Sequence, residues 1–159
     1  MLQINNIFNQ KGQSTKAEDT KKTQCLAFQV GKDLYCVDIL NVKEIRSYST
    51  VTPVPDSEEY LLGILNIRGE ALPVYDVKHR FGYGKTEISQ GSVIIIVSIK
   101  DKNIGLLVDS VSDIVSFEES EIDETSAAKA SLNSQFLKGV AFQNQKSYII
   151  LCIETIFKI

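Results

Sequence analysis

Two parts of the chain carry the same succession of short apolar runs, and this internal repeat limits the fold more than any other feature. Val37-Asp38 and Val108-Asp109 lie 71 positions apart. The later matches, each 76 positions apart, are Gly63 with Gly139, Val74 with Ile150, Val77 with Ile153 and Phe81 with Phe157. A repeat of this kind predicts two similar small units, with a five-residue loop insertion in the second one.

The repeated runs have the length and composition of β-strands. CLAFQV and LYCVDI flank Gly31-Lys32-Asp33, and GILNI and ALPVYDV flank Arg68-Gly69-Glu70, so each pair predicts a hairpin. SVIIIVSI is apolar on both faces, which predicts a strand covered on both sides. The spacing predicts a helical turn within 39–45 and a short helix over 77–81 that ends at Gly82. The fold class is therefore mainly β, with about five strands in each unit. Units this small need a shared interface, and closure into barrels would remove their exposed edges.

Composition narrows the function classes. The chain has 159 residues and a formal net charge of −3, whereas a general nucleic-acid binder is expected to carry a basic excess. Its apolar runs are much shorter than the ~20 residues that span a bilayer, and no signal peptide is recognisable, so we expect a cytoplasmic protein without direct membrane insertion. The three cysteines lie in apolar runs and predict buried side chains instead of a disulfide framework or a zinc site. Residues 1–22 are polar and predict a flexible tail before a folded region at 23–159.

No motif points to catalysis. The one histidine, His79, lies between basic residues in the predicted short helix, which is typical of a surface position. Paired carboxylates such as Glu118-Glu119 and Asp123-Glu124 fall in a polar linker, where a solvated loop is expected. We therefore expect no enzyme activity, no catalytic residue, no metal ligand and no cofactor.

Arg68 is unusual because it interrupts an apolar, strand-like run. Counting strand faces places it outward with Asn66, where it could be solvated, clamp a substrate anion or contact a partner. Arginine is enriched at protein interfaces because its planar fork binds carboxylates and amides. Glu44, which follows the predicted helical turn, is the expected ion-pair partner.

Three blocks of the sequence carry a family resemblance. GILNIRGEALPVYDVKHRFG, at 63–82, resembles the signature of CheW-like chemotaxis coupling proteins, in which Asn, an aliphatic residue and Arg-Gly precede a proline-containing strand ending in Asp. LYCVDILNVKEI resembles the upstream segment of that family, and IGLLVDSVSDIVSF the downstream one. The blocks keep the family's order and spacing over about residues 24–158. Glu58 and Glu59 depart from the pattern, because apolar residues are often found there, and this departure bears on partner specificity.

The resemblance implies two five-stranded SH3-like β-barrel subdomains with a shared core and short helices, at about 23–84 and 85–159, with strand exchange between them allowed. It implies a non-enzymatic adaptor, recruited to membrane-associated receptor arrays. Its partners would be the cytoplasmic signalling tip of chemoreceptors and the CheW-like regulatory domain of a histidine kinase, with other coupling proteins as a further class. A receptor helix would enter the groove between the barrels. The implied partner-binding residues are Val42, Glu44, Arg68, Val93, Gly105, Val111 and Ile114. Because no ATP-binding or receiver-like segment follows Ile159, a stand-alone coupler is favoured over a kinase domain or a receiver fusion.

Two other function classes stay open on the residues alone. A small β-barrel could bind single-stranded nucleic acid if its aromatic side chains lined a basic groove, although many of them fall in apolar strand positions and the net charge is negative. An enzyme could use Arg68 to hold an anion, but the sequence offers no convincing base or nucleophile to act with it.

Overall fold

The computed structural model describes residues 22–124 and 136–158. The predicted tail at 1–22 lies almost wholly outside the described residues, as does the 125–135 part of the predicted linker at 118–135. Within the described part of the chain, no helix is long and apolar enough to cross a membrane.

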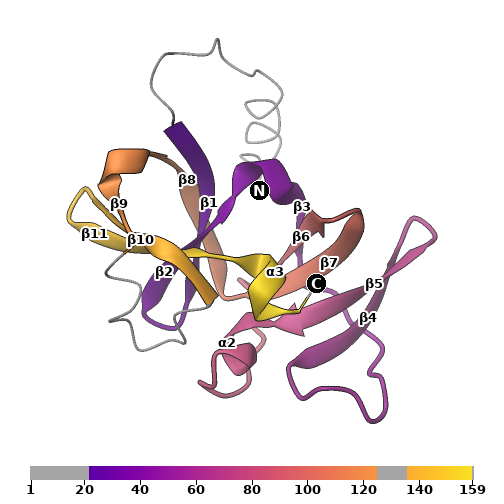
Figure 1. The fold of residues 1–159 in the computed structure, drawn as a ribbon. Coiled ribbons are helices and arrows are strands. Elements are labelled where there is room, and N and C mark those ends of the chain that lie inside the picture. The colour runs from indigo at the N-terminus through magenta and orange to yellow at the C-terminus, as the bar shows by residue number, and fades with distance from the viewer. Residues whose placement is uncertain (1–21, 125–135, 159) are drawn as a thin grey trace.

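The described strands form two mixed sheets that stand beside each other (Figure 1). The first, sheet A, has the strand order β8-β1-β2-β11-β10-β9, and the second, sheet B, has the order β3-β6-β7-β5-β4. The strands of sheet A are β1 (Lys22–Val30), β2 (Asp33–Asp38), β8 (Ser110–Glu118), β9 (Ile122–Asp123), β10 (Leu137–Gln143) and β11 (Lys146–Leu151). The strands of sheet B are β3 (Val42–Ser47), β4 (Leu61–Ile67), β5 (Glu70–Asp76), β6 (Val93–Ile99) and β7 (Lys102–Val108). The short helical elements are η1 (Ile39–Asn41), α2 (Val77–Arg80), η2 (Glu119–Glu121) and α3 (Ile153–Ile156).

The two sheets repeat one arrangement of strands. The hairpin β1–β2 corresponds to β6–β7, and the hairpin β4–β5 with α2 corresponds to β10–β11 with α3. In sheet B, Gly63 pairs with Val74 and Val74 with Gly105, while in sheet A, Gly139 pairs with Ile150 and Ile150 with Cys36. The mainly β fold in two barrel-like halves and the 76-residue spacing of the second hairpins agree with the sequence analysis.

The spacing of the first hairpins differs from the sequence prediction. Their turns lie at Gly31-Lys32 and Lys100-Asp101, which are 69 residues apart, and the same offset fits the strand registers on both sides. The match of Val37-Asp38 with Val108-Asp109 was therefore wrong by two residues. The prediction matched the two Val-Asp pairs because they are identical. The positions of the turns show that the equivalent residues lie two positions away.

Strands β3 and β8 are exchanged between the halves. β3 follows β2 of sheet A but pairs with β6 of sheet B, and β8 follows β7 of sheet B but pairs with β1 of sheet A. Each sheet therefore takes strands from both sides of residue 84, so the sheets do not divide the chain at the subdomain boundary expected near 84–85.

Both barrels are closed by a short segment that approaches a glycine. Thr52 forms an isolated bridge with Ile64 of β4, and β9 pairs with β10 in the same way through Asp123 and Val140. This second pairing adds the two-residue strand β9 and makes sheet A six-stranded where five strands were expected. The offset grows from 69 at the first hairpins to 76 at the second, so the insertion is seven residues and not the predicted five. Five of the seven fall between Asp123 and Gly139, a stretch that includes residues outside the described chain.

Three apolar clusters hold the fold together, and the alternation of side chains along strands explains them. One cluster draws on both sheets and is the shared core, whereas the other two each belong to a single sheet. In β6, Ile95 and Val97 enter the shared core while Ile94 and Ile96 enter the core of sheet B. This two-sided burial confirms the prediction made from SVIIIVSI.

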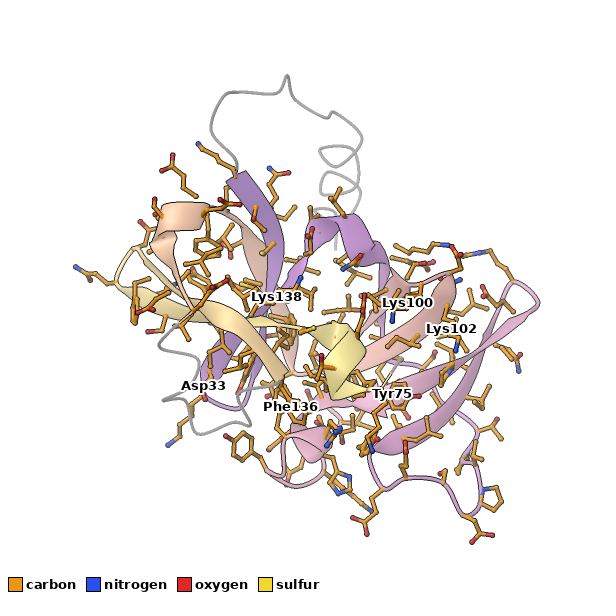
Figure 2. All side chains as sticks on the ribbon, in the orientation of Figure 1. Asp33, Tyr75, Lys100, Lys102, Phe136 and Lys138 are labelled. Carbon is orange, nitrogen blue, oxygen red and sulfur yellow. The ribbon has the colours of Figure 1, made fainter. Side chains whose placement is uncertain are left out.

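The two short helices meet between the sheets. The Arg80 Nε of α2 donates a hydrogen bond of 2.7 Å to the carbonyl oxygen of Ile156 in α3. The same guanidinium group lies 4.7 Å from the ring centres of Tyr60 and Phe136, where cation–π attraction adds to the packing. Tyr75 stacks on Phe157 with ring centres 4.6 Å apart, and Figure 2 shows Tyr75 and Phe136 beside α3. These contacts join the two halves of the molecule.

Candidate functional site

Arg68 lies at the tip of the β4–β5 hairpin. Strand β4 ends at Ile67, and Arg68 and Gly69 have φ angles of +50° and +83°. Two successive positive φ angles are the geometry of a tight two-residue hairpin turn. The hairpin predicted across Arg68-Gly69-Glu70 is confirmed. The face count that placed Arg68 on the strand was wrong, because β4 stops one residue before it, although its exposure was predicted correctly. Asn144 takes the equivalent place in the other barrel, with φ of +53°.

Arg68 pairs with Glu44, as the sequence analysis expected. The Arg68 Nη2 lies 2.5 Å from Glu44 Oε1, and the Arg46 Nη1 lies 3.0 Å from Glu44 Oε2. The Arg68 side chain is 73% exposed, whereas that of Glu44 is 27% exposed. One carboxylate therefore fixes two guanidinium groups, and Arg68 keeps most of its donors open to solvent.

Arg68 and Glu44 border a hollow that we call the Arg68 surface. Its volume is about 560 Å³, and its lining residues are Lys43, Glu44, Ile67, Arg68, Glu70, Leu72, Ile96 and Asn103. The apolar members Ile67, Leu72 and Ile96 belong to the core of sheet B and form the floor. Asn103 Nδ2 donates to Glu70 Oε2 at 2.9 Å on the rim. An apolar floor with a charged rim is suited to a protein contact.

The other predicted partner-binding residues occupy two kinds of position. Val93, Val111 and Ile114 are half-buried and pack against the shared core. Val42 is 0% exposed and Gly105 is buried, so neither presents a side chain at the surface. Val42 on β3 and Val111 on β8 are 69 residues apart and take equivalent places on the two exchanged strands.

Gly105 has a packing role in the structure. A Cβ atom at this position would lie 2.9 Å from Ile94 Cγ2 and 3.0 Å from Val74 Cγ2. Side chains at such distances would have to move, so glycine lets β7 pack closely against its neighbours. Any effect of Gly105 on partners must pass through the packing of sheet B.

Sequence reasoning missed Arg46, the second partner of Glu44, and several residues that line the Arg68 surface. Arg46 is two positions from Glu44, so strand alternation alone could have placed both side chains on one face of β3. Lys43, Glu70 and Asn103 come from three different strands, and no spacing in the sequence indicates that they meet. Among the described residues, no group of three His, Cys, Asp or Glu side chains could hold a metal ion.

The Glu44 carboxylate has a pKa below its ordinary value. Partial burial raises the pKa, but the hydrogen bonds and charges of Arg68 and Arg46 outweigh that effect and favour the ionised form. A carboxylate with a lowered pKa in the folded state stabilises the fold above its unfolded-state pKa, and this contribution is lost as the pH falls through the folded-state pKa.

We therefore expect Glu44→Gln to be less stable than the natural protein at neutral pH, with the difference narrowing as the pH falls below about 4.5. Urea unfolding of both proteins at several pH values measures the difference. Arg46→Gln with an intact Glu44 should retain part of the pH dependence, since Arg68 still pairs with the carboxylate. A difference that stays constant with pH would contradict the lowered pKa.

Comparisons with known proteins agree on one family. A family model described as a CheW-like domain matches residues 24–159. A probable chemotaxis protein CheW of Rhizobium etli is 34% identical over 134 residues, covering 84% of this chain and 86% of that protein. The chemotaxis protein CheW of Bacillus subtilis is 33% identical over 107 residues, covering 67% of this chain and 69% of that protein. The crystal structure of the scaffolding protein TtCheW from Thermoanaerobacter tengcongensis superposes with a TM-score of 0.81 and 32% sequence identity, covering 87% of this chain and 94% of that one.

Proposed function

Because this chain belongs to the CheW-like family, we propose that it couples chemoreceptors to a histidine kinase by binding both. The chain is a chemotaxis scaffold of two SH3-like halves and not an enzyme. The finer part of the proposal is that one surface takes the cytoplasmic tip of the receptor and another takes the regulatory domain of the kinase. The matches support an adaptor and give no support to the nucleic-acid alternative.

The Arg68 surface is the observation that carries the proposal. It places an exposed, oriented guanidinium group beside an apolar floor, which is the combination that protein interfaces favour. Glu44 holds the side chain in place, so less conformational entropy is lost when a partner binds. Val93, Val111 and Ile114 are candidates for a second contact, because they are partly exposed around the shared core.

Coupling in this proposal needs no chemistry on the chain. Two modest contacts on one rigid body raise the effective concentration of kinase at the receptors, so that the assembly binds more tightly than either contact alone. Kinase activity would then respond to changes in packing at these contacts. Residence at membrane-associated receptor arrays follows from the same partners.

We expect Arg68→Ala to weaken binding to at least one partner about tenfold, because truncation of a central interface arginine commonly costs more than 1 kcal/mol. The loss of stability should stay below about 1 kcal/mol, since the pair with Glu44 is largely solvent-exposed. Co-sedimentation with receptor cytoplasmic fragments and with the kinase regulatory domain, separately and together, measures binding, and thermal melting measures stability.

Lys146→Ala is the matched control, because Lys146 is an exposed charge just after the turn of the β10–β11 hairpin. Its binding should equal that of the natural protein. Unchanged binding of Arg68→Ala to both partners would remove Arg68 from the proposal. Failure of the natural protein to bind either partner would overturn the proposed coupling itself.

A further inference from the structure

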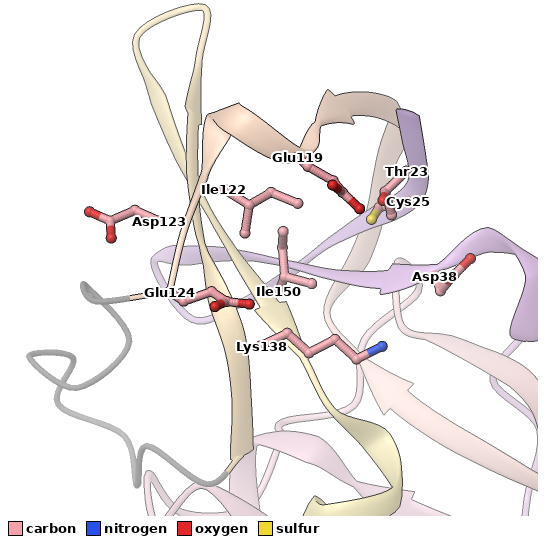
Figure 3. A pocket seen from close by; sticks show the side chains of 9 residues that line it. All are labelled: Thr23, Cys25, Asp38, Glu119, Ile122, Asp123, Glu124, Lys138 and Ile150. Atoms are coloured by element: carbon pink, nitrogen blue, oxygen red, sulfur yellow. The ribbon is translucent and has the colours of Figure 1, made fainter. Parts of the chain in front are cut away.

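The barrel of sheet A has a pocket at one end of its core. Its volume is about 710 Å³ (Figure 3). The lining residues are Thr23, Cys25, Asp38, Glu119, Ile122, Asp123, Glu124, Lys138 and Ile150. None of them belongs to the Arg68 surface, so this pocket is a separate feature of the molecule.

The other barrel carries different side chains at the equivalent positions. By the offsets that relate the two sheets, Cys25, Asp38 and Lys138 stand where sheet B has Ile94, Leu107 and Leu62. Ile94 and Leu107 are fully buried in the sheet B core, and Leu62 packs against that core. Three large apolar side chains are thus replaced by a thiol, a carboxylate and an ammonium group. This end of the sheet A core therefore carries polar groups where the sheet B core is apolar.

The floor and the rim of this pocket differ in chemistry. The floor is made by Cys25, Ile122 and Ile150, which belong to or pack against the sheet A core. Carboxylates from separate elements stand around it: Asp38 ends β2, Glu119 lies on η2 and Glu124 follows β9.

Lys138 is the one basic residue in the lining, and Figure 3 shows its side chain reaching across the floor. Asp38 Oδ1 also accepts a hydrogen bond of 2.9 Å from the backbone N–H of Leu40, which fixes that carboxylate. Asp123 adds a further carboxylate to the rim, turned outward in Figure 3.

We propose that this pocket receives an arginine side chain presented by a segment of a partner protein. The methylene stem of arginine would cover the apolar floor, as long basic side chains do on apolar surfaces. Its guanidinium group has five donors in a planar fork and can reach carboxylates on different elements at once. The rim carries more carboxylates than its single ammonium neutralises, so it is complementary to a cation and repels an anion.

A capped peptide, acetyl-Ala-Arg-Ala-amide, tests the proposal as a probe. Titration into the full chain is followed by two-dimensional amide NMR at low salt. The expected result is a saturable shift of the signals of Thr23, Cys25, Glu119, Ile122 and Lys138. The same peptide with citrulline in place of arginine keeps the stem and loses the charge, and it should bind about fivefold more weakly or worse.

Two variants and one control make the test specific. Glu119→Gln/Glu124→Gln keeps the shape of the rim but removes two charges, and it should weaken arginine binding about fivefold. Lys138→Leu removes the one ammonium group of the lining, so it should strengthen arginine binding severalfold. Glu59→Gln/Glu87→Gln removes two exposed charges elsewhere and should leave binding unchanged.

Equal binding of the arginine and citrulline peptides would overturn the proposal, as would stronger binding of acetyl-Ala-Glu-Ala-amide. Shifts confined to residues outside the pocket, or no saturable shift at any residue, would overturn it too. Because the probe is a tripeptide and not a receptor or kinase fragment, these outcomes do not depend on whether the coupling function holds.

Discussion

Replacing Asp76 with alanine should lower the free energy of unfolding by about 3 kcal/mol, because three partly buried donors would lose the carboxylate that accepts their hydrogen bonds. The Asp76 side chain is 2% exposed and caps the start of α2. Its carboxylate accepts hydrogen bonds from Thr86 N at 2.8 Å, from Thr86 Oγ1 at 2.6 Å and from His79 N at 3.3 Å. One side chain thus fixes both the helix and the segment that leads from it to β6.

Urea unfolding of Asp76→Ala and Glu87→Ala tests this expectation. Glu87 is an exposed carboxylate next to Thr86, and its loss should change stability by less than about 0.5 kcal/mol. Thr86→Val, which removes one of the donors and leaves the carboxylate in place, should have an intermediate effect. Equal stability of Asp76→Ala and Glu87→Ala would show that the buried hydrogen bonds contribute nothing net to folding.

The repeat carried most of what the sequence could predict about the fold. The pair Gly63 and Gly139, and the later pairs that are also 76 positions apart, correctly identified the equivalent hairpins. A glycine is needed at both places because a closing segment approaches the backbone there. The first hairpins were misaligned by two residues, because β1 and β6 share an apolar pattern but few identities. The sequence analysis allowed for an exchange of strands between the halves but could not identify β3 and β8 as the exchanged strands. Periodicity shows that a segment is a strand and does not indicate which sheet the strand joins.

The candidate site was predicted in part. Glu44 and Arg68 were chosen together and they do form an ion pair. The turn at Arg68 was predicted from the two apolar runs that flank Arg68-Gly69-Glu70, although face counting treated Arg68 as part of the strand. The burial of Val42 could not be predicted from the sequence. Whether this first residue of β3 points to solvent or to the shared core depends on the exchange of strands.

Differences between the two halves locate the surfaces that a scaffold could use. Where the halves agree, as at the paired glycines, the residues serve folding. Where they differ, one half offers a surface feature that the other lacks: Arg68 is matched by Asn144 at one hairpin tip, and Lys138 by Leu62 at one barrel end. Two similar halves can therefore share one fold and still present different contacts to different partners.

The paired glycines yield the second large effect. Gly63→Ala should destabilise the protein by about 3 kcal/mol, because its Cβ atom would lie 2.5 Å from the carbonyl oxygen of Thr52. That oxygen cannot move aside easily, since it accepts a hydrogen bond of 2.8 Å from Ile64 N while Thr52 N donates one of 2.9 Å to Ile64 O. A methyl group at residue 63 must therefore push the whole closing segment away from β4.

Two further glycine variants should lose less stability than Gly63→Ala, because the added methyl group lies against more yielding or more distant atoms. At Gly139 a Cβ atom would lie 2.7 Å from the Ile122 Cγ2 atom and 3.3 Å from the Asp123 carbonyl oxygen, so a side chain can yield first and the cost should be about 1–2 kcal/mol. At Gly91 the nearest atoms are 3.9 Å away, and alanine should be tolerated within about 0.5 kcal/mol. The loss of unfolding free energy should be largest for Gly63→Ala, smaller for Gly139→Ala and smallest for Gly91→Ala. If Gly63→Ala were as stable as Gly91→Ala, the approach of residues 51–52 to β4 would not be what closes the barrel of sheet B.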